Sequence, residues 1–383
     1  MTLGGYHMIY LDYAATTPMR KETVEVFSHV AMNMYGNSSS LHDLGTTAQD
    51  LLNNCRAEIA KDIGGHRDGI YFTGSGSEAN ILAIQTLLNG NKRKGTHIIT
   101  TKVEHASIYH LFKKLEKEGY DVTFLDVNKE GQVEMEHLRS AIRPNTCLVS
   151  IQHANSETGT IQPLREIGQF LKEKNILFHS DCVQTYNKLS IDVTDFNLDS
   201  LSISAHKLYG PKGVGCLYIN PKVPWSSIYE EASHEGGMRP GTVNVPGIAA
   251  FTTAAQLMKE ERIQEMDRLA TLKQYFIHSL KNKINTVTIE GSLTESLPNI
   301  VALRFAGIEG QHIMLECNRA QIAISTGSAC QIGAQSPSRS MKAIGLSDEE
   351  ARELIRISFG KHTTIDDIKF TVQTLEKIVN TWL

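Results

Sequence analysis

A regular alternation of strand-like and helix-like segments is the feature that most constrains the fold of this chain. We expect strands at 69–73, 97–101, 122–125, 147–152 and 177–180, separated by helices at 77–88, 107–118, 135–141 and 164–174. The strand-like runs are short and apolar, and the helix-like runs repeat apolar residues at helical spacing. This order favours an α/β fold, with a mainly parallel sheet and helices on both faces. Such sheets bind ligands at the carboxyl ends of their strands.

The residues 200–215, SLSISAHKLYGPKGVG, contain the first candidate functional residue. Apolar and polar residues alternate over 201–206, which predicts a strand with Lys207 at its end. Glycines and a proline then interrupt regular structure. A lysine on a rigid element, next to Ser204 and His206, suits the covalent attachment of pyridoxal phosphate (PLP). Taken alone, the pattern fits a solvated surface lysine equally well.

The overall composition excludes several classes of partner. The chain has 383 residues, enough for two or three domains at roughly 100–200 residues each, and a net charge of −4 from 38 basic and 42 acidic residues. This balance gives no electrostatic basis for binding nucleic acid or an anionic membrane. No apolar run reaches the ~18–20 residues of a membrane helix, and the first residues lack the pattern of a signal peptide. We therefore expect neither a nucleic-acid nor a membrane partner.

The six cysteines indicate a reducing compartment. They form no CxxC pair, and the 15 histidines form no HxxxH or HExxH motif, so we predict a cytoplasmic protein without a metal site. Cys330 differs from the rest because it lies in STGSACQIGAQSPS, a run of small and polar residues. Such a run predicts an exposed loop, on which a thiol can act as a nucleophile.

The pattern changes near residue 247, which indicates a second, smaller α/β unit. We expect helices at 248–283, 311–319, 347–354 and 365–383, and strands at 300–305 and 322–325. Before the alternating region, an extended arm over 8–18 is followed by helices at 21–34 and 44–64. The expected division is an N-terminal arm (1–20) that joins the small domain, a large domain (21–250) and a small C-terminal domain (251–383).

Two segments next to expected strands are candidates for binding a phosphorylated cofactor. The turn GSGS at 74–77 precedes a helix, and its backbone N–H groups, with the hydroxyl of Ser77, suit a phosphate. A Gly/Ser turn is also common in ordinary loops. Asp181 follows the strand at 177–180, where a carboxylate can keep a pyridinium nitrogen protonated. A helix cap or surface aspartate is the alternative.

Three further polar residues follow or interrupt apolar segments. His105, in KVEHASI, is placed to lie against a cofactor ring and to move protons, although a lone histidine often has a structural role. Asn155, in HANSETG, opens a loop after a strand. Arg356, in LIRISFG, has apolar neighbours and either extends its side chain to solvent or pairs with a carboxylate, including that of a substrate.

Several stretches together resemble the cysteine desulfurases of the NifS/IscS kind, in the class V aminotransferase group. They are YLDYAATTP, YGNSSSLH, FTGSGSEAN, EHASI, SIQHANSETG, HSDCVQT, SISAHKLYGPKGVG, GMRPGTVNVP, STGSAC and IRISFG. The stretches occur in the family's order and cover nearly the whole chain.

The resemblance implies a PLP fold-type I homodimer. Its large domain has a mainly parallel seven-stranded sheet and is followed by a smaller α/β C-terminal domain. Lys207 would bind the cofactor covalently, Asp181 its pyridine nitrogen and Gln184 its ring O3′. His105 would stack on the ring.

The same resemblance implies the remaining site residues. The phosphate ligands would be Gly76, Ser77, Ser204 and His206, with Thr242 contributed by the other subunit. Asn155 would contact the cofactor and, with Arg356, the substrate carboxylate. Cys330 would be the sulfur acceptor.

The reaction that the resemblance implies is removal of sulfur from L-cysteine. It would give L-alanine and a persulfide on Cys330, which is passed to an acceptor such as an iron–sulfur scaffold or a dedicated iron–sulfur enzyme. A selenocysteine lyase, or another class V aminotransferase or lyase, stays open as an alternative. A catalytically silent scaffold of the same fold is a third possibility.

Overall fold

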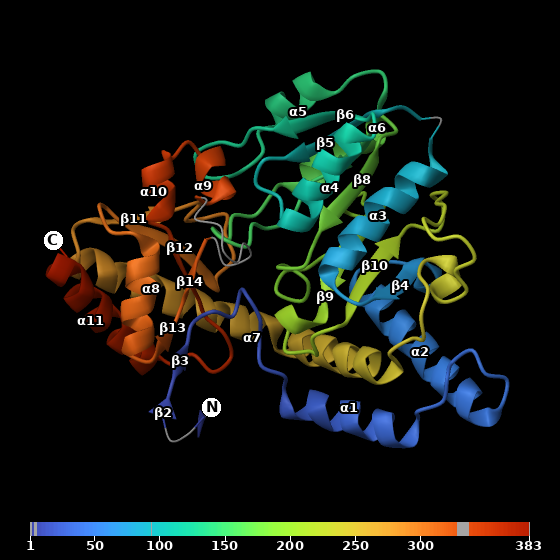
Figure 1. The fold of residues 1–383 in the computed structure, drawn as a ribbon, viewed down its shortest axis with the longest axis horizontal. Helices are drawn as coiled ribbons and strands as arrows, with labels where there is room; N and C mark the ends of the chain where they lie inside the picture. Colours follow the sequence, from blue (N-terminus) through green and yellow to red (C-terminus); the bar gives the residue numbers. More distant parts are fainter. Residues whose placement is uncertain (1, 4–5, 93, 328–336, 383) are drawn as a thin grey trace.

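A seven-stranded sheet forms the centre of the larger part of the molecule (Figure 1). The computed structural model describes residues 2–3, 6–92, 94–327 and 337–382. The strands are β4 (Ile70–Thr73), β5 (His97–Thr101), β6 (Asp121–Leu125), β7 (Thr146–Ser150), β8 (Leu177–Asp181), β9 (Ser200–Ser204) and β10 (Gly215–Ile219). Their order is β4-β10-β9-β8-β7-β5-β6, and β10 is antiparallel to both of its neighbours while the other pairs are parallel. The predicted mainly parallel, seven-stranded sheet is therefore confirmed.

Helices cover both faces of this sheet, as the sequence predicts. The helices are α2 (Asp43–Asp62), α3 (Gly76–Gly90), α4 (Ala106–Lys117), α5 (Met135–Ala141) and α6 (Leu164–Glu173). Because successive side chains of a strand point to opposite faces, Ile98 packs with the cores of α3 and α4. Its neighbour Ile99 packs on the other face, in the core that α2, α5 and α6 share.

A four-stranded antiparallel sheet organises the smaller, C-terminal part. It contains β11 (Val287–Glu290), β12 (Ile300–Phe305), β15 (Ile355–Ser358) and β14 (Ser325–Thr326), in that order. The helices here are α8 (Gly310–Arg319), α9 (Arg339–Ala343), α10 (Asp348–Arg352) and α11 (Ile365–Trp382). Phe305 and Ile357 belong to a core that is separate from those of the larger sheet.

The long helix α7 (Val245–Lys283) connects the two parts (Figure 1). Phe251 and Met258, near its start, belong to the larger core. Leu272 and Phe276, near its end, belong to the smaller core. The predicted domain boundary at residue 250 falls within this helix, and the division into 1–20, 21–250 and 251–383 stays a prediction. None of the described helices is both long and apolar enough to cross a membrane.

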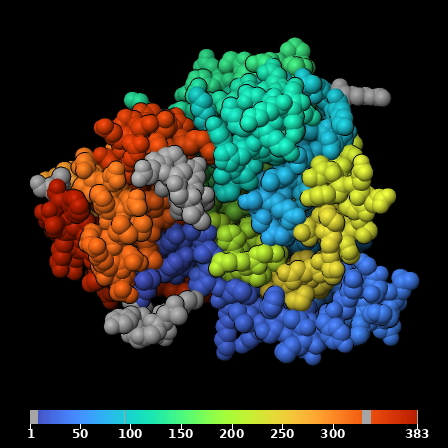
Figure 2. Space-filling model, in the orientation of Figure 1, coloured from blue at the N-terminus to red at the C-terminus, as the bar shows by residue number. Residues whose placement is uncertain are grey.

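The N-terminal arm lies between the two parts of the molecule (Figure 2). A hairpin of β1 (Thr2–Leu3) and β2 (Tyr6–His7) precedes β3 (Ile9–Tyr10), which pairs in parallel with β13 (Ile322–Ala323). Further along the arm, Asp12 forms an isolated β-bridge with Ser358 of the smaller sheet. Helix α1 (Lys21–Asn33) then packs along α7.

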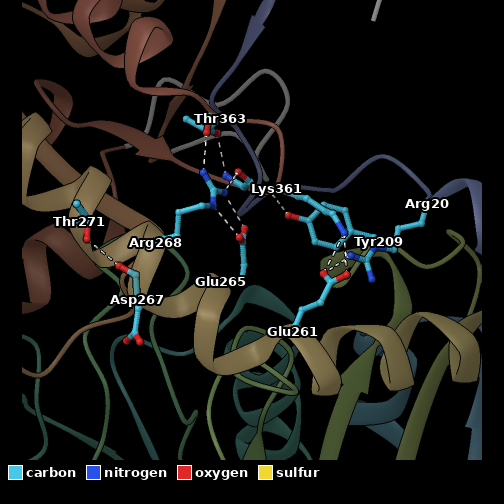
Figure 3. A network of polar contacts seen from close by, with 10 residues as sticks. Arg20, Tyr209, Glu261, Glu265, Asp267, Arg268, Thr271, Lys361 and Thr363 are labelled. Atoms are coloured by element: carbon cyan, nitrogen blue, oxygen red, sulfur yellow. Dashed lines mark hydrogen bonds and ion pairs between the residues drawn. The ribbon is translucent and has the colours of Figure 1, made fainter.

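A cluster of charged groups ties the arm and α7 to the segment after β15 (Figure 3). Glu261 accepts hydrogen bonds from Lys361 Nζ at 2.9 and 3.0 Å and pairs with Arg20. Further along α7, Arg268 donates two hydrogen bonds of 2.8 Å to Glu265 and one to the carbonyl of Thr363. These polar contacts therefore join the N-terminal arm, α7 and the segment after β15.

The structure corrects three of the sequence predictions. The strand predicted to continue through residue 206 ends at Ser204, and Lys207 lies in a 3₁₀ turn, Ala205–Lys207, because Leu208 and Gly210 N–H both donate to the Ala205 carbonyl. The strand predicted at 322–325 is divided into β13, which pairs with the arm, and β14, which pairs with β15. The predicted helix at 347–354 ends at Arg352, because β15 begins soon after it.

Candidate active site

A cavity of about 320 Å³ lies at the carboxyl ends of the parallel strands, between the two sheets. The predicted site residues that line it are Gly76, Ser77, His105, Asn155, Asp181, Gln184, Ser204, His206, Lys207 and Arg356. Thr242 is exposed and does not belong to this lining. Cys330 falls outside the described residues. The structure therefore brings ten of the twelve predicted residues to one cavity.

Lys207 is held against the N-terminal arm. Its Nζ donates hydrogen bonds to the carbonyls of Ala14 at 2.6 Å and Ala15 at 2.8 Å. The backbone two residues later is unusual, because Tyr209 has φ +66°, a left-handed conformation that is costly for an aromatic residue. Thr17 Oγ1 stabilises it by accepting a 2.7 Å bond from the Tyr209 N–H. The arm thus fixes both Lys207 and the turn that follows it.

Asp181, at the end of β8, is held in one orientation by two donors. Its Oδ1 accepts from the Val183 N–H at 2.9 Å, and its Oδ2 accepts from Asn80 Nδ2 at 2.7 Å. Asn80 also donates to Ser107 Oγ at 3.1 Å, while its own Oδ1 is buried and has no partner among the residues that the structure describes. Sequence reasoning missed Asn80, although its position four residues after Gly76 places both on one face of α3.

The same cavity contains two buried hydrogen-bond acceptors and a glycine, Gly76, whose backbone is closely approached by neighbouring side chains. Ser204 Oγ and Gln184 Oε1 have no hydrogen-bond partner within the described residues, although Gln184 donates to Ala14 O at 3.0 Å. At Gly76 a Cβ would stand 2.7 Å from Val183 Cγ2 and 3.1 Å from Ser204 Cβ. Gly76 begins the 15-residue helix α3, whose N-terminal N–H groups favour an anion.

The two predicted histidines, His105 and His206, both have lowered pKa values that favour the neutral imidazole. Burial lowers the pKa of His105, against an opposing effect of Asp181, and lowers that of His206 to about 4 with help from the charge of Lys207. His105 caps α4 and its Nδ1 accepts the Ser107 N–H at 3.2 Å, which leaves the ring proton on Nε2.

Asn155 organises the loop that follows β7. Its Oδ1 accepts from the N–H groups of Glu157 and Thr158 at 2.8 and 2.9 Å. Its Nδ2 donates to Val103 O at 3.0 Å and Ser340 Oγ at 3.3 Å. The amide therefore links the loop before His105 to the start of α9, in addition to lining the cavity.

Arg356, on β15, brings the smaller sheet to the cavity. It is 6% exposed, and it donates to Asp12 Oδ1 at 2.6 Å and to the Ser156 carbonyl at 3.0 Å. Its Nε is buried and lacks a partner within the described residues. Asp12, from the arm, was not among the predicted site residues.

Comparison with known proteins identifies the family. The model of the class-V aminotransferases matches residues 9–370. The chain is 50% identical over 369 residues to the protein designated NifS of Bacillus subtilis (strain 168), covering 96% of this chain and 93% of that protein. It is 41% identical over 371 residues to the cysteine desulfurase IscS of Dictyoglomus turgidum, covering 97% and 94%. The chain belongs to the class-V aminotransferases, in their NifS/IscS group.

Solved structures give the same assignment. A NifS-like protein superposes with a TM-score of 0.91 at 30% identity, covering 98% of this chain and 100% of that one. SspA, solved in complex with cysteine, superposes with a TM-score of 0.82 at 32% identity, covering 93% and 100%. The resemblance seen in the sequence motifs is therefore confirmed at the level of family and fold.

The residues of the cavity fit the cofactor of class-V aminotransferases, PLP. The Ser204 hydroxyl, which has no partner within the described residues, lies beside Gly76 at the start of α3, where the N-terminal N–H groups of the helix favour an anion such as a phosphate. In the same lining, Asp181 presents a fixed carboxylate suited to a ring nitrogen. One cavity thus contains an amine (Lys207), groups suited to an anion (Gly76 and Ser204) and a carboxylate (Asp181).

Two buried carboxyl groups of the cavity were also missed by sequence reasoning. Burial raises the pKa of Glu104 to about 8, although the Gln152 N–H and the Thr101 hydroxyl donate to it. Burial likewise raises the pKa of Glu157, which accepts from the hydroxyls of Ser338 at 2.5 Å and Ser340 at 3.0 Å. Their burial was not predictable, because Gln152 in the first case and Ser338 and Ser340 in the second come from distant parts of the chain.

Proposed function

We propose that this chain is a PLP-dependent cysteine desulfurase that releases L-alanine from L-cysteine. The observation that most supports this proposal is that Lys207, Asp181, His105 and Arg356 line one cavity. The chain that contains this cavity belongs to the NifS/IscS group. Family membership and the relatives' names support desulfurase activity, and the SspA complex with cysteine supports the substrate.

The proposed acid–base chemistry centres on Lys207. When bound, PLP supplies an electron sink that acidifies the Cα–H of an attached amino acid. Lys207 would hold the cofactor and, once displaced by the substrate amino group, accept the Cα proton at Nζ. Asp181 would hold a proton on the ring nitrogen, Gln184 would bind O3′ and His105 would stack on the ring. The phosphate ligands would be Gly76, Ser77, Ser204 and His206.

Substrate orientation would depend on Arg356 and Asn155. The guanidinium of Arg356 can bind a carboxylate in a bidentate manner. Its Nε, which has no partner in the described part of the chain, supports a further acceptor in the cavity. Asn155 Nδ2 supplies a second donor close by. With the carboxylate fixed, the Cα–H of the substrate can be presented to Lys207.

The sulfur transfer is assigned to Cys330. Its thiolate would attack the substrate sulfur, so that an S–S bond forms as the Cβ–S bond breaks. The electron pair of the broken bond takes up a proton to complete alanine, and His105 would help to move protons. L-cysteine and a thiol thereby give L-alanine and a persulfide, with atoms and electrons in balance. An acceptor protein, such as an iron–sulfur scaffold or a dedicated iron–sulfur enzyme, would then receive the sulfur.

A second copy of the chain would complete the site. Thr242 is exposed and outside the cavity of its own chain, which supports its predicted contribution to the partner's phosphate site. The nearby loop after α1 exposes large apolar side chains, with Tyr35 at 65% and Leu41 at 100%. Ser39 Oγ contacts His234 Nδ1 at 3.4 Å, which joins this loop to the segment of Thr242. A homodimer would cover this apolar surface.

A cytoplasmic location is part of the proposal. The five cysteines within the described residues are free thiols and buried, which suits a reducing compartment.

The function is tested by incubating the purified protein, loaded with PLP, with L-cysteine and a reductant. We expect alanine and sulfide in equal amounts, because each turnover removes one sulfur atom from one cysteine. Pyruvate in place of alanine would indicate another kind of lyase. Transfer of the amino group to a 2-oxo acid would indicate an aminotransferase.

Asp12→Asn tests how Arg356 is oriented. The variant removes the charge that holds the guanidinium at 2.6 Å, so the arginine loses its fixed geometry and KM for L-cysteine is expected to rise by about 10-fold. Steady-state kinetics should show a much smaller change in kcat. The neighbouring arm residue Thr16, changed to Ala, is the control, since its hydroxyl contacts His206 instead. A lower KM in Asp12→Asn would mean that Asp12 competes with the substrate, contrary to this account.

A further inference from the structure

A second lysine, Lys188, is buried close to Lys207 and takes no part in the reaction described above. It is 7% exposed, and its Nζ donates a 3.0 Å hydrogen bond to the carbonyl of Gln184. Gln184 is itself in the active-site lining. The amine of Lys188 is therefore buried next to Gln184, one of the residues assigned to the cofactor.

Lys188 and Lys207 line one small cavity behind the active site. Among the described residues of this lining, Glu265 is the carboxylate, and Figure 3 shows it engaged with Arg268. Both Glu265 oxygens accept bonds of 2.8 Å from that guanidinium. The negative charge that could neutralise a buried ammonium is thus already paired with another cation.

The other titratable groups around Lys188 do not supply a negative charge at neutral pH. Tyr13 comes from the arm and Tyr209 from the turn after Lys207, and burial raises the pKa of both phenols. His206 is neutral because burial, with smaller effects of the charges of Lys207, Lys212 and Lys188, lowers its pKa to about 4. Burial, followed by repulsion between the two amines, lowers the pKa of Lys188 to about 7. Because this repulsion is mutual, a proton on either amine disfavours a proton on the other. Two amines therefore share a poorly solvated space, where like charges repel strongly.

We propose that Lys188 is a positioning residue whose positive charge keeps the nitrogen of Lys207 in its unprotonated form. The proposal rests on the proposed function, in which Lys207 must be free of its proton in order to accept one from the substrate. A cationic neighbour is a known way of activating a lysine amine. Lys188 acts through Lys207 and touches neither substrate nor cofactor.

The sign of the effect follows from the charges. A positive neighbour disfavours protonation of Lys207, so removing it raises the pKa of the Lys207 nitrogen. In Lys188→Met, which keeps the shape of the side chain, the absorbance midpoint of the Lys207-linked cofactor is expected to move to higher pH by about one unit. The acidic limb of the kcat profile should move in the same direction.

The test is an absorbance pH titration of the cofactor-loaded protein, which requires no turnover. In Lys188→Arg the charge persists at higher pH, so the midpoint is expected at or below the wild-type value. Lys273→Met is the matched control, because Lys273 is also buried and its pKa is lowered to about 8 by burial alone. Lys273 lies outside both cavities and bonds to Ser296 Oγ and Leu297 O.

An unchanged midpoint in Lys188→Met would overturn the proposal, and so would an equal shift in Lys273→Met. A fall in activity with no change in either pH profile would assign Lys188 a purely structural role. A protein that shows the shift yet releases no alanine from L-cysteine would support the charge effect and contradict the proposed desulfurase function.

Discussion

Replacing Lys207 with alanine is expected to lower the turnover of L-cysteine by at least ~10⁴-fold, the upper range for a lost acid–base group. Under the proposed function, the variant would lose both the covalent attachment of the cofactor and the acceptor of the Cα proton. The Lys207 amine donates to the carbonyls of Ala14 and Ala15 and lines the active-site cavity, which is consistent with both proposed roles. The purified variant should also lack the pH-dependent absorbance of a lysine-linked cofactor.

Lys212→Ala is the control for the Lys207 variant. Lys212 lies five residues later in a separate turn, is exposed and does not belong to the lining of either cavity. We expect wild-type turnover and cofactor content from this variant. Substantial alanine release by Lys207→Ala, under conditions in which Lys212→Ala is normal, would exclude Lys207 as the base.

Replacing Asp181 with asparagine is expected to lower kcat by about 10²–10³-fold, the cost of removing one fixed stabilising group. The substitution keeps the size of the side chain but removes the charge that would hold a proton on the ring nitrogen. Asn80 and the Val183 N–H would orient the new amide less completely than the carboxylate. The Nδ2 of the introduced asparagine cannot accept a hydrogen bond, so one of the two donors would lose its acceptor. Steady-state kinetics should therefore show a large loss in kcat, and cofactor absorbance should show that PLP is still bound.

A second aspartate of the same sheet provides the matched control for Asp181. Asp199 precedes β9 at the opposite, amino end of the strands, where its Oδ2 accepts the Phe178 N–H at 2.9 Å. Asp199→Asn should reduce stability without an effect of that size on kcat. Equal kinetic losses in the two variants would mean that the Asp181 result reflects the sheet and not the cofactor.

The central features were predictable because they are local in the sequence. The strands of the parallel sheet are short apolar runs, and the polar residues that follow them, such as His105 and Asp181, necessarily meet at one edge. Family motifs then assigned roles that spacing alone left open. The 3₁₀ turn of Lys207 was missed, since it depends on how the arm holds the chain around Tyr209.

The features that sequence reasoning missed depend on contacts between distant segments. Asp12 and Arg356 are far apart in the chain and meet because the arm crosses to β15. Glu157 is buried by its contacts with Ser338 and Ser340, and nothing in its local sequence indicates burial. Asn80 was the exception, because helical spacing from Gly76 could have indicated its position.

The most direct test of the proposed function is detection of the persulfide. The cofactor-loaded wild type and Cys330→Ala would each be treated with one equivalent of L-cysteine, alkylated and analysed by peptide mass spectrometry, with Cys317→Ala as a buried-thiol control. We predict an additional sulfur atom on Cys330 in the wild type and in Cys317→Ala. Cys330→Ala should keep its cofactor and yield neither persulfide nor sulfide. Equal release of alanine and sulfide by Cys330→Ala and the wild type would contradict the assignment of Cys330 as sulfur acceptor, and with it the proposed mechanism.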